Sequence, residues 1–91
     1  MFGFLVEIEV DDGLASDESD ALWRDFMALL EDRGLLADGG TGGRTWTYRI
    51  HSEASQATDG DRKAIEAWAR ARPAIVSASV GELFDIEVRL T

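Results

Sequence analysis

The side chains best suited to binding chemistry are the basic residues, which concentrate in one predicted helix. The chain has nine bases; Lys63 is the single lysine and the others are arginine. A guanidinium donates two parallel hydrogen bonds to a phosphate or carboxylate, so grouped arginines suit an anionic partner. Lys63 and Arg70 are seven residues apart and therefore share a helix face. We predict a partner-binding basic set that consists of Arg44, Arg49, Arg62, Lys63, Arg70 and Arg72.

The acids beside these bases allow a second interpretation. Asp59, Asp61 and Glu66 lie in the same segment, so the charges can form an ordinary solvated helix face with surface ion pairs. The formal net charge is -9, from 18 acids and nine bases. Such a field repels nucleic acid at long range. A local phosphate-contacting patch and a solvated helix face both stay open at this point.

The candidate catalytic residue lacks partners. His51 is the single histidine, and its neighbours Ser52 and Glu53 follow in a predicted strand, where successive side chains point to opposite faces. No nucleophile and base are therefore brought together. We predict that the chain is not an enzyme, with no catalytic residue and no small-molecule substrate.

Nucleotide and metal motifs are incomplete. The glycines at 39–43 lack the lysine of a phosphate-binding loop and precede a strand, so we predict a flexible hairpin turn or a loop that orders on a partner. Neither Asp11-Asp12-Gly13 nor Asp59-Gly60-Asp61 matches a calcium loop. There is no cysteine to form a disulfide or a thiolate metal site. We predict no metal and no cofactor.

Alternating hydrophobicity predicts the strands that must position these residues. Residues 2–10 place five apolar side chains on one face, and residues 44–51 repeat the pattern with Trp46, Tyr48 and Ile50. Residues 75–80 and 83–90 are also predicted strands, and Leu35-Leu36 either starts a short strand or packs on the preceding helix. We expect Trp46 and Tyr48 to face the core; the alternative is an open sheet face where aromatics stack on bases.

Two helices are predicted from apolar spacing and from their end signals. The first covers about 17–33, with Ser16 as N-cap and Gly34 as a left-handed terminator. The second follows Thr58, with Asp61 three residues later in a capping box, and ends at Pro73.

The resulting βαββαβ order predicts one α+β domain over residues 1–91, a ferredoxin-like plait with two helices on one face of an antiparallel sheet. No apolar run is long enough to span a bilayer, and the start resembles no signal peptide. Together with the absence of cysteine, this predicts a cytoplasmic protein that does not contact a membrane.

Several segments resemble one bacterial family. Phe2-Gly3-Phe4 opens a strand as in the YggL family of large-ribosomal-subunit-binding proteins, and residues 57–73 are similar to its Ala-Thr-Glu-x-Asp-Arg…Trp-Leu…Arg-Pro helix. Residues 80–85 resemble its closing Gly/Ser-x-Leu-x-Asp segment. The likeness spans roughly residues 2–88.

The resemblance implies a non-enzymatic protein that associates with the large ribosomal subunit, with a role in assembly as a further expectation. Some family members carry a basic N-terminal extension, whereas this sequence starts at the first strand. Contact with basic ribosomal protein therefore fits the net charge better than broad contact with ribosomal RNA. The alternative function is an acidic adaptor or inhibitor that docks a basic partner through residues 11–20, with Asp11, Asp12, Asp17, Glu18 and Asp20.

Overall fold

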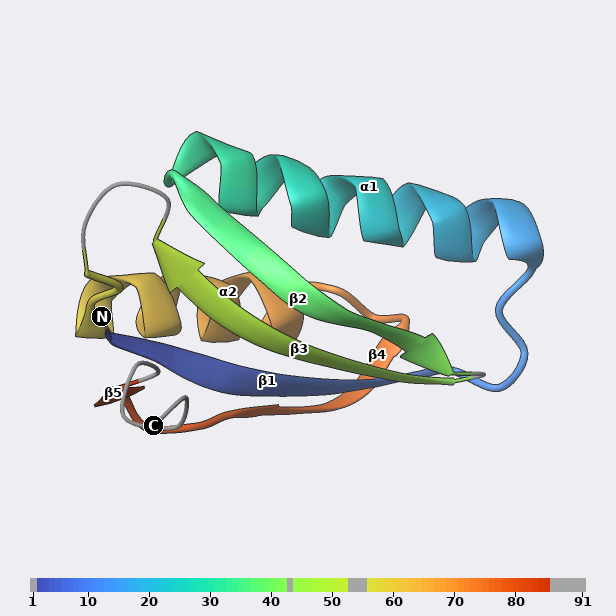
Figure 1. The fold of residues 1–91 in the computed structure, drawn as a ribbon. Helices are drawn as coiled ribbons and strands as arrows, with labels where there is room; N and C mark the ends of the chain where they lie inside the picture. The colour runs from blue at the N-terminus through green and yellow to red at the C-terminus, as the bar shows by residue number, and fades with distance from the viewer. Residues whose placement is uncertain (1, 43, 53–55, 86–91) are drawn as a thin grey trace.

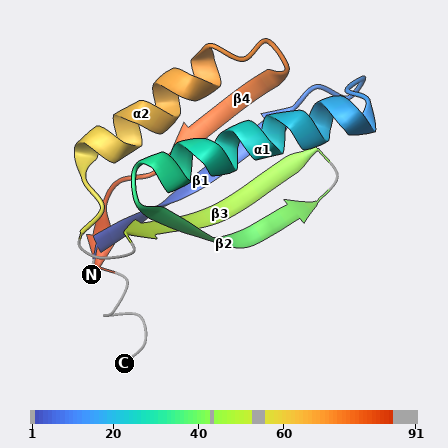
Figure 2. The ribbon, with the colours of Figure 1, turned by 90° about the horizontal axis from the view of Figure 1, so that it is seen from above.

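The computed structural model describes residues 2–42, 44–52 and 56–85. Two helices cover one face of a twisted antiparallel sheet with strand order β2-β3-β1-β4 (Figures 1 and 2). This order confirms the predicted ferredoxin-like plait. The elements are β1 (Phe2–Val10), α1 (Ser16–Asp32), β2 (Leu35–Gly42), β3 (Thr45–Ser52), α2 (Asp59–Arg70), β4 (Ile75–Val80) and β5 (Phe84–Asp85).

The core lies between the helices and the sheet because the strands alternate apolar and polar residues. Phe4, Val6 and Ile8 of β1 are fully buried, and Trp46, Tyr48 and Ile50 pair with them from β3. The Phe26 ring of α1 lies 6.2 Å from Trp46 and 5.8 Å from Tyr48, between ring centroids. Trp46 and Tyr48 therefore face the core, as expected, and are not available for base stacking.

The prediction of a flexible turn at 39–43 was wrong for the part that the structure describes. Residues 39–42 continue β2, where Gly39 pairs with Tyr48 and Gly40 with Thr47 of β3. Backbone pairing with a long neighbouring strand outweighs the weak strand preference of glycine. Gly39 has φ +140°, and an added Cβ would lie 2.1 Å from the Thr47 oxygen. Gly43 lies outside the described residues.

The helix ends confirm most of the predicted signals. Gly34 has φ +67° after α1, and Thr58 forms a reciprocal capping box with Asp61 at the start of α2. Ser16 is not the N-cap, because α1 begins one residue earlier and Ala15 occupies that position. Alanine has no side-chain oxygen to cap the helix, and instead the Glu18 carboxylate accepts a 3.4 Å hydrogen bond from the Ala15 N–H.

The predicted last strand is described only in part. Its Phe84–Asp85 segment pairs with Phe2 and Gly3 at the start of β1, after the break that was expected near Gly81. The remaining residues, 86–90, lie outside the described part of the chain. Neither described helix is long and apolar enough to cross a membrane.

Candidate partner-binding surfaces

The predicted basic set does not form one patch. Arg49 is aligned with Leu5 of β1, so it lies on the open face of the sheet, which the helices do not cover. Lys63 and Arg70 are exposed on α2, on the other side of the sheet. The six residues are therefore divided between two faces, a division that the strand alternation already indicated for Arg49.

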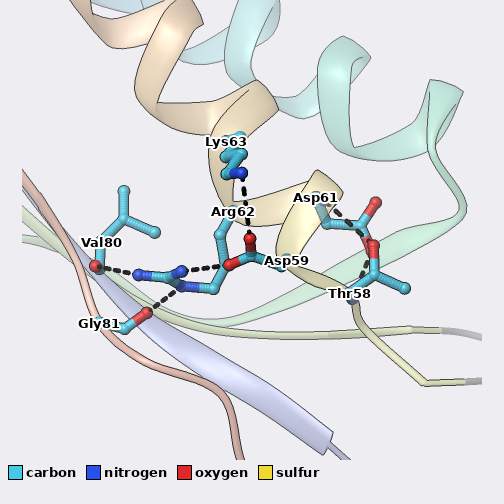
Figure 3. Close-up of polar contacts among 7 residues, drawn as sticks. All are labelled: Thr58, Asp59, Asp61, Arg62, Lys63, Val80 and Gly81. Carbon is cyan, nitrogen blue, oxygen red and sulfur yellow. Dashed lines mark hydrogen bonds and ion pairs between the residues drawn. The ribbon is translucent and has the colours of Figure 1, made fainter.

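Arg62 holds α2 to the end of β4 (Figure 3). Its Nε donates to the Gly81 oxygen at 2.6 Å, and its Nη2 donates to the Val80 oxygen at 3.2 Å. Its Nη1 donates to the Asp59 carboxylate in the first turn of the same helix. The guanidinium is thus occupied by bonds within the domain, and its side chain is only 20% exposed.

Lys63 shares the same carboxylate from the outer side. Its Nζ lies 3.4 Å from Asp59 Oδ2, and its side chain is 76% exposed. The hydrogen bond from Arg62, and secondly the contact with Lys63, lowers the pKa of Asp59 below its ordinary value. This pair of bases around one exposed acid is the ordinary helix-face pairing that the sequence left open.

Three further arginines form ion pairs within the domain. Arg33, at the end of α1, donates to Asp61 at 2.8 Å and so joins the ends of the two helices. Arg72 lies 3.6 Å from Asp25 and 5.2 Å from the Trp68 ring centroid. Arg44 lies between two acids, 3.7 Å from Glu9 and 3.8 Å from Asp12. In the described chain these pairs leave few cations for a partner, chiefly Arg24, Arg49 and Arg70.

The exposed side of α1, by contrast, carries acidic residues that form no ion pair within the described part of the chain. Helical spacing places them along one side of the helix, away from the buried Leu22, Phe26 and Leu30. Arg24 lies among them and offsets part of their charge. We call this surface the α1 acidic face, and define it by Asp17, Asp20, Glu31 and Asp32.

The sequence indicated only the first half of this face. Asp12 pairs with Arg44, Asp11 accepts a hydrogen bond from the Gly13 N–H, and Glu18 accepts one from the Ala15 N–H. These three acids of the expected docking edge at 11–20 therefore serve local structure. Glu31 and Asp32 were missed, although their helical spacing from Asp17 was the signal that could have found them.

The open face of the sheet has few aromatic residues among the described strand positions; register places His51 of β3 and Phe84 of β5 there, both aligned with Gly3 of β1. Glycine, serine and threonine dominate it, with Glu7 and Glu9 of β1 near its centre. Arg49 lies beside them, and its Nε has no hydrogen-bond partner in the described chain. Stacking of nucleic-acid bases requires aromatic or guanidinium planes, and on this face the described strand positions offer those of Arg49, His51 and Phe84, at and near one end of β1.

The His51 side chain is paired with a carboxylate and not with a nucleophilic hydroxyl group. Its Nε2 lies 3.1 Å from Asp38 Oδ2 of β2, and its side chain is 20% exposed. Ser52 is buried on the opposite face of β3. Among the residues that the structure describes, no group of three or more histidine, cysteine or acidic side chains could hold a metal ion.

An apolar groove lies between the second half of α1 and β2. It encloses about 390 Å³, with Met27, Leu30 and Glu31 contributed by α1 and Leu35 and Leu36 by β2. Leu30 and Leu35 are buried in its floor, whereas Leu36 is 44% exposed. The groove therefore joins apolar surface to the acidic face of the neighbouring helix.

Comparison with known proteins identifies the family. A sequence model described as "YggL 50S ribosome-binding protein" matches residues 1–87, almost the whole chain. No curated protein matches it. The match confirms the resemblance of the first strand, the second helix and the closing segment, and it supports association with the large ribosomal subunit. The chain belongs to the YggL family of 50S ribosome-binding proteins.

Proposed function

We propose that the domain docks on a basic ribosomal protein of the large subunit through the α1 acidic face, without enzymatic activity. The observation that carries this proposal is the unequal use of charge. Most bases are engaged within the domain, whereas Asp17, Asp20 and Asp32 project from α1 without an ion pair in the described chain. A surface with unpaired carboxylates is complementary to a cationic partner.

Contact led by ribosomal RNA fits the domain less well. RNA-binding plaits present aromatic side chains on the open sheet face, but Trp46 and Tyr48 are buried in the core, and the described aromatics of the open face, His51 and Phe84, lie at one end of β1. Arg62, central to the predicted basic set, is bonded to backbone oxygens of β4 and the following glycine. With a net charge of -9, phosphate contacts would also be opposed by long-range repulsion.

The test compares two triple variants that remove the same amount of charge. The first, Asp17→Asn/Asp20→Asn/Asp32→Asn, neutralises the α1 acidic face. The matched control neutralises Glu7, Glu66 and Glu82 to glutamine; these acids also lack an ion pair among the described residues. Association with purified large subunits is measured by biolayer interferometry over a salt series.

We expect the α1 variant to associate roughly 3- to 10-fold more slowly at low salt, because charge complementarity acts mainly on the association rate. The control should associate at close to the unmodified rate. Equal slowing in both variants would mean that total charge matters and not the α1 face. A third variant, Lys63→Glu/Arg70→Glu, should bind normally; strong loss there would favour an RNA-led contact.

The role in assembly is the finer expectation from the family resemblance and stays a prediction. It predicts that deletion of the chain from its native cell raises the proportion of large-subunit precursors in a sucrose gradient. An unchanged proportion of precursors during rapid growth would contradict it.

A further inference from the structure

The groove between α1 and β2 has the form of a site for an added strand. Sheet order places β2 at one edge, so its outer backbone groups have no strand partner among the described residues. Gly40 and Gly42 lie in this edge strand, and space beside each is open. An exposed strand edge of this kind is a template for β-strand addition.

An added strand would meet both apolar and acidic side chains on each of its faces. On the helix side, Met27 and Glu31 of α1 line the groove. On the open side, Leu36 and Asp38 are aligned with His51 and Arg49 of β3. Strand side chains alternate between faces, so a bound segment meets an apolar contact and a carboxylate on either side.

The charge around the groove selects the class of occupant. Among the described residues, Glu31 is the one charged residue that lines the groove, and Asp32 follows it on α1. The nearest base in sequence, Arg33, is held 2.8 Å from Asp61 of α2. On the other side Asp38 is 71% exposed; it lies 3.1 Å from His51 Nε2 and is aligned with Arg49 of β3, so part of its charge is offset. An acidic segment would be repelled here, and a basic one attracted.

We infer that this groove binds an extended segment of a basic ribosomal protein, in which apolar side chains are interspersed with lysine or arginine, by strand addition to β2. The inference rests on the proposed function, since it names the part of the partner that the acidic domain recognises. The apolar side chains would contact Met27 and Leu36, and the basic ones Glu31 and Asp38. Leu36 is the residue most open to such a partner, because it is 44% exposed.

The test uses the full chain and purified large subunits. Leu36→Asp places a charge at the rim of the groove, and Leu36→Ala removes the apolar side chain. Val76→Asp is the matched control, because Val76 is 64% exposed on β4 at the opposite edge of the sheet. Circular dichroism and thermal unfolding establish which variants remain folded.

We expect roughly 10-fold weaker binding for Leu36→Asp, a smaller loss for Leu36→Ala and normal binding for Val76→Asp. Photoreactive p-benzoylphenylalanine at position 36 provides a second measurement that does not depend on Leu36→Asp being folded. It should crosslink to a ribosomal-protein peptide in which apolar and basic residues are interspersed, whereas the same group at position 76 should not capture that peptide.

The outcomes separate this inference from the proposed function. Normal binding by both Leu36 variants, with loss in the Asp17/Asp20/Asp32 variant, overturns the groove and leaves acidic docking in place. Crosslinking from position 36 to ribosomal RNA, or to no component, also overturns the inference. Weaker binding by Leu36→Asp with normal binding by the Asp17/Asp20/Asp32 variant would support the groove but contradict the α1 acidic face.

Discussion

Replacement of Asp61 by asparagine should destabilise the domain far more than its single lost charge suggests. Asp61 is 8% exposed, and each carboxylate oxygen has a separate role. Oδ2 accepts from the Thr58 N–H at 2.9 Å, which caps α2, and Oδ1 accepts from Arg33 Nε at 2.8 Å, which joins α1 to α2. Asparagine keeps one acceptor oxygen, so its NH₂ must face either the Thr58 N–H or the guanidinium.

The expected loss follows from these two bonds. A lost N-terminal cap costs about 1 kcal/mol, and a lost hydrogen bond to a charged group costs about 1.5–3 kcal/mol before screening. The Arg33 side chain is 37% exposed, which reduces the second contribution. Because the amide retains one of the two bonds, we expect a loss of about 2 kcal/mol in the free energy of unfolding. For a domain of this size that lowers Tm by roughly 8–16 °C.

Thermal and urea unfolding of Asp61→Asn and Asp59→Asn provide the measurement. Asp59 lies two residues earlier on the same helix and carries the same charge, but its side chain is 55% exposed and pairs only at the surface. The control should therefore unfold close to the unmodified Tm. Equal destabilisation of both variants would refute the reasoning, because it would trace the loss to charge and not to the two buried bonds.

Three further predictions concern the same contacts. Arg62→Gln should lower the free energy of unfolding by about 1.5–3 kcal/mol and increase hydrogen exchange in β4 and residues 80–82, because it removes the bonds to Val80 and Gly81. Lys63→Gln should change both quantities little, and equal effects of the two variants would contradict this role of Arg62. Gly39→Ala should cost about 2 kcal/mol or more because its Cβ would lie 2.1 Å from the Thr47 oxygen, and Gly40→Ala, with open space, should remain stable in urea unfolding. The pKa of Asp59 is lowered in the folded state, so its pairing stabilises the fold above the unfolded-state pKa, and this contribution is lost as the pH falls through the folded-state pKa. In Arg62→Gln, NMR titration should show a higher pKa for Asp59. An unchanged pKa would rule out Arg62 as the main cause of the shift.

The fold was predictable because local signals and the hydrophobic pattern agree. The alternation of Phe4, Val6 and Ile8 sets the buried face of β1, and the same period in β3 places Trp46 and Tyr48 in the core. The capping box of α2 was visible from Thr58 and Asp61. The glycine-rich part of β2 was missed because its conformation depends on pairing with β3, a contact that the local composition does not encode.

From the sequence, the partner-binding residues were predicted to be a basic set, with an acidic edge at 11–20 as the alternative, and the location of the candidate site depends on contacts that spacing does not encode. Sequence spacing placed Arg62 in a basic set, yet its bonds to Val80 and Gly81 join residues far apart in the chain. Which acids remain unpaired likewise depends on tertiary contacts, such as that between Arg44 and Asp12. The family could be predicted from the α2 motif. The groove beside Leu36 could not be predicted, because it depends on how α1 lies over β2 in the folded domain.

Docking through the α1 acidic face is best tested by binding of the Asp17→Asn/Asp20→Asn/Asp32→Asn variant to purified large subunits, beside the Glu7/Glu66/Glu82 control. We expect slower association for the α1 variant alone, with the difference shrinking as salt rises, because exposed charges are screened within about 10 Å at 0.1 M salt. Identical association of the α1 variant and the unmodified chain at low salt would contradict docking through the α1 acidic face.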